Sequence, residues 1–138
     1  MVTNSHVEFP IYRLAPEYPF PAAIEDALKA YKNLLKKNKN SKEIFIAGDS
    51  AGGGLTLALL QKIKLEKLAM PSCAIVISPW TDLTLSGDSI QTRGHRDPMI
   101  KPGPSMQIAV DAYCNGENPN NPLISVSYTH LTLPTKNE

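Results

Sequence analysis

The spacing of apolar residues along the chain predicts an alternation of helices and strands. From Ala22 to about Lys37, apolar side chains recur every three or four positions, while Lys29, Lys32 and Lys36 fall on the opposite face. Such spacing is typical of an amphipathic helix that packs on a sheet with its charged face in solvent. The apolar positions of this helix are Ile24, Leu28, Tyr31 and Leu35.

Short apolar runs at Glu43–Ala47 and Cys73–Ser78 predict two buried strands. Between them, apolar residues cover most of the circumference of a second helix, predicted from about Gly52 to Lys64. A helix that is apolar on most sides is usually buried. This order of elements, joined by short links, predicts an α/β fold in which parallel strands are flanked by helices.

The remaining parts of the chain are less regular. Residues 6–12 alternate between apolar and polar, which predicts a strand, but Pro10 removes a backbone donor and restricts that strand to an edge. The glycines and prolines of Trp80–Pro104 predict a long surface excursion without regular structure. A short helix is expected from Ser105 to Tyr113, followed by a loop from Asn115 to Pro122.

Composition narrows the class of protein. At 138 residues the chain is long enough for one domain with a buried core, and its net charge of +1 gives no electrostatic footprint for nucleic acid. Cys73 and Cys114 are far apart and indicate neither a metal site nor a disulfide framework. No stretch approaches the roughly 20 apolar residues that span a bilayer. We therefore expect a cytoplasmic chain without metal, cofactor, nucleic acid or membrane partner.

The most informative stretch surrounds Ser50, where a predicted strand ends and the buried helix begins. Gly48–Gly52, with the sequence GDSAG, matches GxSxG, the strand-turn-helix motif that exposes a nucleophilic serine. A tight turn of this kind requires small neighbours, and the residues around the serine meet this requirement. They are Gly48, Ala51, Gly52 and Gly53.

Ser50 needs partners to act as a nucleophile. A serine hydroxyl requires a base within hydrogen-bond reach and a third group that orients the base. The helix that follows directs its free N–H groups and positive dipole end toward a developing oxyanion, and the backbone N–H of Ala51 is the predicted oxyanion donor. Asp49 precedes the serine, and as a buried or half-buried carboxylate it is expected to have a structural role.

Further blocks of sequence lie on both sides of Ser50. They are YRLAPE at 12–17, PFPAAIEDA at 19–27, GDSAGG at 48–53, SPWTDL at 78–83, RDPM at 96–99 and NPLIS at 121–125. In order and approximate spacing, these blocks resemble the hormone-sensitive lipase family of α/β-hydrolases over Ile11 to Ser125. The resemblance implies a partial α/β-hydrolase fold and an enzyme that hydrolyses short to medium carboxylic esters through a Ser, Asp and His triad.

Within this resemblance, Ser50 corresponds to the nucleophile and Ala51 to an oxyanion donor. The family places an HGG-type oxyanion loop before the first block, and its triad aspartate and histidine after the last. We therefore interpret residues 1–125 as the central part of one α/β-hydrolase domain, incomplete at both ends. Residues 126–138 include SYTHLTLPT, which resembles translated sequencing-adapter read-through, so we expect an artefactual tail and give His130 no catalytic role.

Four residues are candidates for the surroundings of the site. We hypothesise that Arg13, Glu17 and Asp82 form a scaffold network near Ser50, because each lies in a family-like block. Trp80 follows a predicted strand at the sheet edge where open α/β folds bind ligands. It either walls an acyl pocket or covers core surface.

The resemblance predicts hydrolysis of a small-molecule carboxylic ester, with Ser50 forming an acyl-enzyme. By itself the 138-residue chain is expected to be marginally stable, because the family's missing strand would leave sheet edges unpaired. It is also expected to be inactive, because neither His6 nor His95 is a good candidate for the base. Two alternatives stay open. One is a non-catalytic ligand-binding protein on the same fold, and the other is a structural or interaction fragment that uses the lysine-rich helix.

Overall fold

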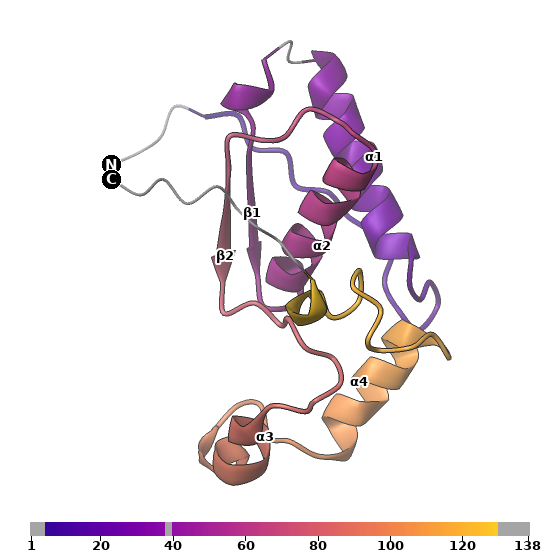
Figure 1. Ribbon diagram of the computed structural model, residues 1–138, viewed down its shortest axis with the longest axis vertical. Helices are drawn as coiled ribbons and strands as arrows, with labels where there is room; N and C mark the ends of the chain where they lie inside the picture. Colours follow the sequence, from indigo (N-terminus) through magenta and orange to yellow (C-terminus); the bar gives the residue numbers. More distant parts are fainter. Residues whose placement is uncertain (1–4, 38–39, 130–138) are drawn as a thin grey trace.

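The computed structural model describes residues 5–37 and 40–129, and a two-stranded parallel sheet lies at its centre (Figure 1). Strand β1 is Phe45–Asp49 and strand β2 is Cys73–Ile77, with Phe45 opposite Cys73. Parallel strands require a crossover connection, which helix α2 (Ala51–Leu65) supplies. The predicted α/β fold, with parallel strands and flanking helices, is confirmed.

The two helices nearest the sheet form where the apolar spacing predicts them. Helix α1 is Ala22–Lys37, and the charges at its two ends complement the helix dipole, with Glu25 in the first turn and lysines in the last. Helix α2 begins at Ala51 rather than Gly52. Strand β1 begins later than predicted, because Ser41–Glu43 form a short 3-10 helix, η1, ahead of it.

The main core lies where α1 and α2 meet the sheet. Its members are Ala27, Leu28, Tyr31, Ile44, Leu59 and Ile63. Ile63 is fully buried, and full burial of such a side chain contributes about 1.5–3 kcal/mol. The Tyr31 hydroxyl donates to the Ala69 carbonyl at 2.5 Å, so the polar tip of this buried ring is satisfied.

Both strands expose every second residue. Ile46 packs toward the core, whereas Phe45, Ile75 and Ile77 are each more than half exposed, at 63%, 55% and 60%. In the described part of the chain, α1 and α2 lie on one face of the sheet, and the other face is open (Figure 1). The prediction that the strands are buried is therefore wrong at alternate positions.

Beyond β2 the chain leaves the sheet, and here the sequence predictions are partly wrong. Helix α3 (Asp88–Arg93) and a 3-10 turn, η2 (Gly94–Arg96), form within the stretch predicted to lack regular structure. Helix α4 (Pro104–Cys114) confirms the predicted short helix, and its first turn accommodates the proline. No helix in residues 5–37 and 40–129 is long and apolar enough to cross a membrane.

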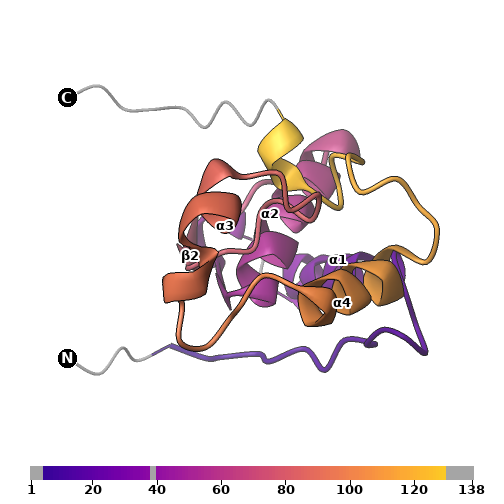
Figure 2. The ribbon, with the colours of Figure 1, turned by 90° about the horizontal axis from the view of Figure 1, so that it is seen from below.

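The strand predicted at residues 6–12 does not form. Residues 5–14 lie along one side of the molecule and pair with neither β1 nor β2 (Figure 2). Phe9 and Ile11 are 87% and 96% exposed, because their alternation meets no strand or helix among the described residues that could cover one face. The alternating pattern is present, but the sheet edge that would use it is absent from the described residues.

The last described residues pack against the body. Val126–Tyr128 form a 3-10 helix, η3, and Val126 joins a buried cluster with Ile24 and Ala58. The Ser127 N–H donates to the Thr81 carbonyl at 3.1 Å. A domain boundary after residue 125 stays a prediction, and residues 130–138 of the predicted tail lie outside the described residues.

We expect Ile63→Ala to lower the free energy of unfolding by about 2–5 kcal/mol, because it leaves a cavity in the main core. Ile75→Ala removes the same atoms from the open face and is expected to change stability by less than about 0.5 kcal/mol. Urea unfolding followed by circular dichroism measures both. Equal losses in the two variants would contradict the one-sided core.

Candidate active site

Ser50 occupies the turn between β1 and α2 in a backbone conformation that residues with side chains rarely adopt. Its φ is 53° and its ψ is −118°. Such strain costs about 1–3 kcal/mol and persists only where the surroundings hold it. Here the Ser50 N–H donates to the Ile77 carbonyl at 2.9 Å, and the Ser50 carbonyl accepts from Gly54 N at 3.1 Å and Trp80 N at 2.9 Å. The serine is thus fixed between both strands and the helix.

The glycines around Ser50 differ in their steric roles. A Cβ at Gly48 would lie 2.1 Å from the Gly52 carbonyl oxygen, and one at Gly54 would lie 2.3 Å from the Trp80 carbonyl oxygen. At Gly53 it would meet a proline side chain at 2.9 Å. At Gly52 it would meet nothing within 4 Å. The predicted need for a small residue therefore holds at Gly48 and Gly53 but not at Gly52.

The Ser50 side chain is exposed at the start of α2, and its hydroxyl bonds to none of the described residues. The N–H groups of Ala51, Gly52 and Gly53 also lack an acceptor within the described chain, as expected for the first turn of a helix. Free donors and a positive dipole end thus surround an exposed hydroxyl, which suits the stabilisation of an oxyanion.

Asp49 does not have the structural role predicted for it. It is the last residue of β1 and lies on the open face of the sheet, so its side chain is exposed. Among the described residues it makes no hydrogen bond or ion pair. The alternation of the strand, which the sequence shows only weakly here, decides that this carboxylate faces away from the core.

A cavity of about 220 Å³ adjoins the turn, and its lining is mostly apolar. Ala51, Trp80, Tyr12 and Tyr113 are among the residues that line it. Trp80 also packs against the buried cluster that contains Leu83, so it both walls the cavity and covers core surface. Burial, with smaller contributions from neighbouring groups, raises the pKa of Tyr113 to about 12, which keeps its hydroxyl neutral.

Asp82 organises the loop that carries Trp80. Its carboxylate accepts hydrogen bonds from the Thr84 N–H at 2.8 Å, the Thr84 hydroxyl at 2.5 Å and the Ser86 hydroxyl at 3.0 Å. Burial opposes the charged form, but these hydrogen bonds outweigh it and lower the pKa of Asp82. The Asp82 carbonyl accepts from Trp80 Nε1 at 2.9 Å, which orients the indole ring.

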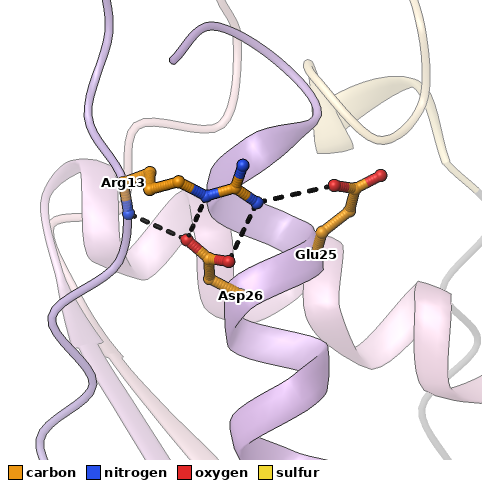
Figure 3. Close-up of polar contacts among 3 residues, drawn as sticks. All are labelled: Arg13, Glu25 and Asp26. Carbon is orange, nitrogen blue, oxygen red and sulfur yellow. Dashed lines mark hydrogen bonds and ion pairs between the residues drawn. The ribbon is translucent and has the colours of Figure 1, made fainter. Parts of the chain in front are cut away.

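Arg13 reaches onto helix α1, as Figure 3 shows. Its Nε donates to Asp26 Oδ2 and its Nη2 to Asp26 Oδ1, both at 2.9 Å, and Nη2 lies 3.6 Å from Glu25 Oε2. Glu17 makes no hydrogen bond or ion pair with any described residue. The predicted network of Arg13, Glu17 and Asp82 is therefore wrong, because Arg13 and Asp82 are satisfied by other partners.

None of the histidines in residues 5–37 and 40–129 is hydrogen-bonded to Ser50. His6 is exposed and lies 3.8 Å from Glu8, and His95 is exposed in η2. His130, which we excluded as a base, lies outside the described residues. Within the same ranges, no group of three or more His, Cys, Asp or Glu side chains could hold a metal ion.

Three residues of the site and its surroundings escaped prediction. Gly54 could have been found, because a third consecutive glycine is unfavourable in a helix and needs a reason. Asp26 could have been weighed as a partner for Arg13, since both lie in family-like blocks. Tyr113 carries no local signal, because its contact with the cavity depends on where α4 packs.

Substitution of two glycines in the turn is expected to have opposite effects. Gly48→Ala forces atoms to shift around Ser50 and should destabilise the chain by about 1–3 kcal/mol. Gly52→Ala meets open space in a helix and should stabilise it by about 0.5–1 kcal/mol. Urea unfolding of the two variants tests this, and a destabilised Gly52→Ala would contradict the open space around position 52.

Relatives with similar sequences are esterases. A family model described as alpha/beta hydrolase fold matches residues 2–135. The acetyl-hydrolase of Streptomyces hygroscopicus is 40% identical over 121 residues, which are 88% of this chain and 40% of that protein. The chain thus spans about two fifths of the length of this relative.

Solved structures give the same result. The crystal structure of EstE5 soaked with ethyl alcohol superimposes with a TM-score of 0.83 at 46% identity, covering 87% of this chain and 40% of EstE5. The HSL-homolog EstE7 from a metagenome library gives a TM-score of 0.81 at 47% identity, covering 86% of this chain and 40% of EstE7. The strained serine between a parallel strand and a helix, the family model and these relatives together show that this chain belongs to the α/β-hydrolase family, in its hormone-sensitive lipase and carboxylesterase group.

Proposed function

We propose that Ser50 is the nucleophile of a carboxylic ester hydrolase. The observation that carries this proposal is the backbone of Ser50, which holds an exposed hydroxyl in a strained conformation at the start of a helix. Strain at a residue with a side chain is costly and concentrates at functional sites. The acetyl-hydrolase and esterase names of the relatives support the same reaction.

In the proposed reaction, Ser50 Oγ attacks the ester carbonyl carbon while its proton passes to a general base. The tetrahedral oxyanion is stabilised by the free N–H of Ala51 and the positive end of α2. The alcohol leaves with a proton, and an acyl group remains on Ser50. Water then hydrolyses this acyl-enzyme to release the carboxylic acid and restore the hydroxyl.

The apolar cavity beside Ala51 is the proposed site for the apolar part of a small-molecule ester. Its volume of about 220 Å³ suits a short chain rather than a long lipid. Trp80 forms one wall, and its ring is held by the hydrogen bond from Nε1 to the Asp82 carbonyl. We therefore assign Trp80 and Asp82 to the shape of this pocket and not to the chemistry.

We further propose that the 138-residue chain alone hydrolyses esters at a negligible rate. No described histidine reaches Ser50, and without a base a serine hydroxyl is a poor nucleophile at neutral pH. A chimaera of this chain with EstE7 tests whether Ser50 acts as the nucleophile when the rest of an esterase provides the base. In it, this chain replaces the segment of EstE7 with which it aligns.

The chimaera is expected to hydrolyse p-nitrophenyl butyrate, an ester with which EstE5 crystals were soaked. Ser50→Ala in the chimaera should lower kcat by on the order of 10³-fold or more, because the nucleophile is lost. Ser72→Ala removes an exposed hydroxyl elsewhere and serves as the matched control. A folded chimaera whose turnover survives Ser50→Ala would exclude Ser50 as the nucleophile.

A non-catalytic ligand-binding protein is the second candidate, favoured by a formed cavity that no histidine among the described residues lines. The chimaera separates the two functions. A ligand-binding segment that lacks a competent nucleophile would leave a folded chimaera without turnover. An active chimaera that depends on Ser50 would support the esterase.

A further inference from the structure

One wall of the cavity is made by a segment with little support from apolar packing. Residues 12–15, called the wall segment below, line the cavity together with Ala51 and Trp80. The segment belongs to neither strand nor helix, and Leu14 within it is 63% exposed. Ile11, just before it, is 96% exposed. Apolar burial therefore does little to fix the position of this wall.

Polar contacts made by Arg13 hold the wall segment in place instead. Between residues 9 and 17, Arg13 makes the only hydrogen bonds and ion pairs to any other element of the described chain. Its guanidinium forms two parallel hydrogen bonds with the Asp26 carboxylate, and its backbone N–H donates to Asp26 Oδ2 at 3.0 Å (Figure 3). The backbone of the wall segment is thus bonded directly to α1.

The geometry of the Arg13–Asp26 contact makes it stronger than an ordinary surface ion pair. Exposed pairs contribute little, but a bidentate arginine and carboxylate with an added backbone donor is the favourable exception. The Arg13 guanidinium also lies over the Tyr18 ring, 5.6 Å from the ring centroid, which adds a cation–π contact. Hydrogen bonds from the Arg13 side chain and backbone also lower the pKa of Asp26, so its carboxylate stays charged at neutral pH.

The contact between Arg13 and Asp26 also fixes the position of the wall segment relative to other residues that line the cavity. Asp26 lies one turn along α1 from Ala23, which is buried and lines the same cavity. The distance between the wall segment and α1 is therefore set by the length of the Arg13–Asp26 pair. Beyond the wall segment, Phe20 is bonded to α4 through its N–H and the Tyr113 carbonyl at 2.8 Å.

We propose that Asp26 is a positioning residue that, through Arg13, holds the wall segment against α1 and so limits the size of the group that can enter the cavity and reach Trp80. That this group is part of an ester rests on the proposed function. The limit on the size of the group does not rest on the proposed function, because it follows from how the cavity wall is held.

The test uses the fluorescence of Trp80, the single tryptophan of the chain, which lines the cavity. Acrylamide is a small neutral quencher and succinimide a bulkier one. In the wild-type 138-residue chain, acrylamide should quench Trp80 more strongly than succinimide. Asp26→Asn is expected to raise the ratio of the succinimide to the acrylamide quenching constant by roughly twofold, because the wall opens locally.

Glu8→Gln is the matched control. It breaks an ion pair with Lys37 at 2.7 Å that ties the same N-terminal stretch to the same helix, away from the cavity. The quenching ratio should not change in this variant. A change as large as that in Asp26→Asn would overturn the proposal, because it would show general loosening of the stretch.

Arg13→Lys keeps the charge but cannot form the two parallel hydrogen bonds, and it is expected to raise the ratio to an intermediate value. It decides the question if thermal melting shows that Asp26→Asn is unfolded. An unchanged ratio in Arg13→Lys, or a wild-type chain in which both quenchers act equally, would overturn the proposal. Neither result depends on turnover, so failure here is distinct from failure of the esterase assignment in the chimaera.

Discussion

The three hydrogen bonds at the backbone of Ser50 are the constraint on which the rest of the structure depends. The N–H of Ser50 is bonded to the end of β2, and its carbonyl is shared between α2 and the chain that leaves β2. Each such bond contributes roughly 0.5–1.5 kcal/mol, so the three together are enough to offset the cost of a strained residue. The parallel register of β1 and β2 brings the Ile77 carbonyl to this point, because it places Asp49 opposite Ile77. The pairing of the two strands therefore helps to set the backbone geometry of Ser50.

The same junction positions the surroundings of the serine. Because Trp80 N is bonded to the Ser50 carbonyl, the loop after β2 starts at the turn itself. Asp82 then folds this loop through Thr84 and Ser86, and its carbonyl orients the Trp80 ring. The position of Trp80 in the cavity wall is thus fixed by backbone bonds that originate at Ser50. The wall segment is held by the ion pair between Arg13 and Asp26 of α1, which is sensitive to salt in a way that the backbone bonds at Ser50 are not.

Burial is uneven across the sheet, and the residues that form the buried core are not the residues that form the candidate site. The face that packs on α1 and α2 carries the core around Ile63, while the other face leaves Ile75 and Ile77 exposed. The site lies at the carboxyl ends of the strands, where open parallel sheets bind ligands. Residues there are fixed by hydrogen bonds and steric limits at Gly48 and Gly54 more than by apolar area.

The sequence by itself determined α1, α2, α4, both strands and the position of Ser50 in a turn, because each of these depends on local spacing or on a short motif. It did not determine what lies beside each element. The alternation at residues 6–12 predicted a strand, but a strand needs a neighbour, and none of the described residues supplies one. Asp49 was expected to be buried or half-buried with a structural role, yet the pleat of β1 turns it to the open face. Arg13 was assigned the wrong partners, because choosing among nearby acids requires knowing that α1 presents Asp26 to it. These outcomes were decided by the tertiary structure, since they depend on contacts between residues far apart in the chain.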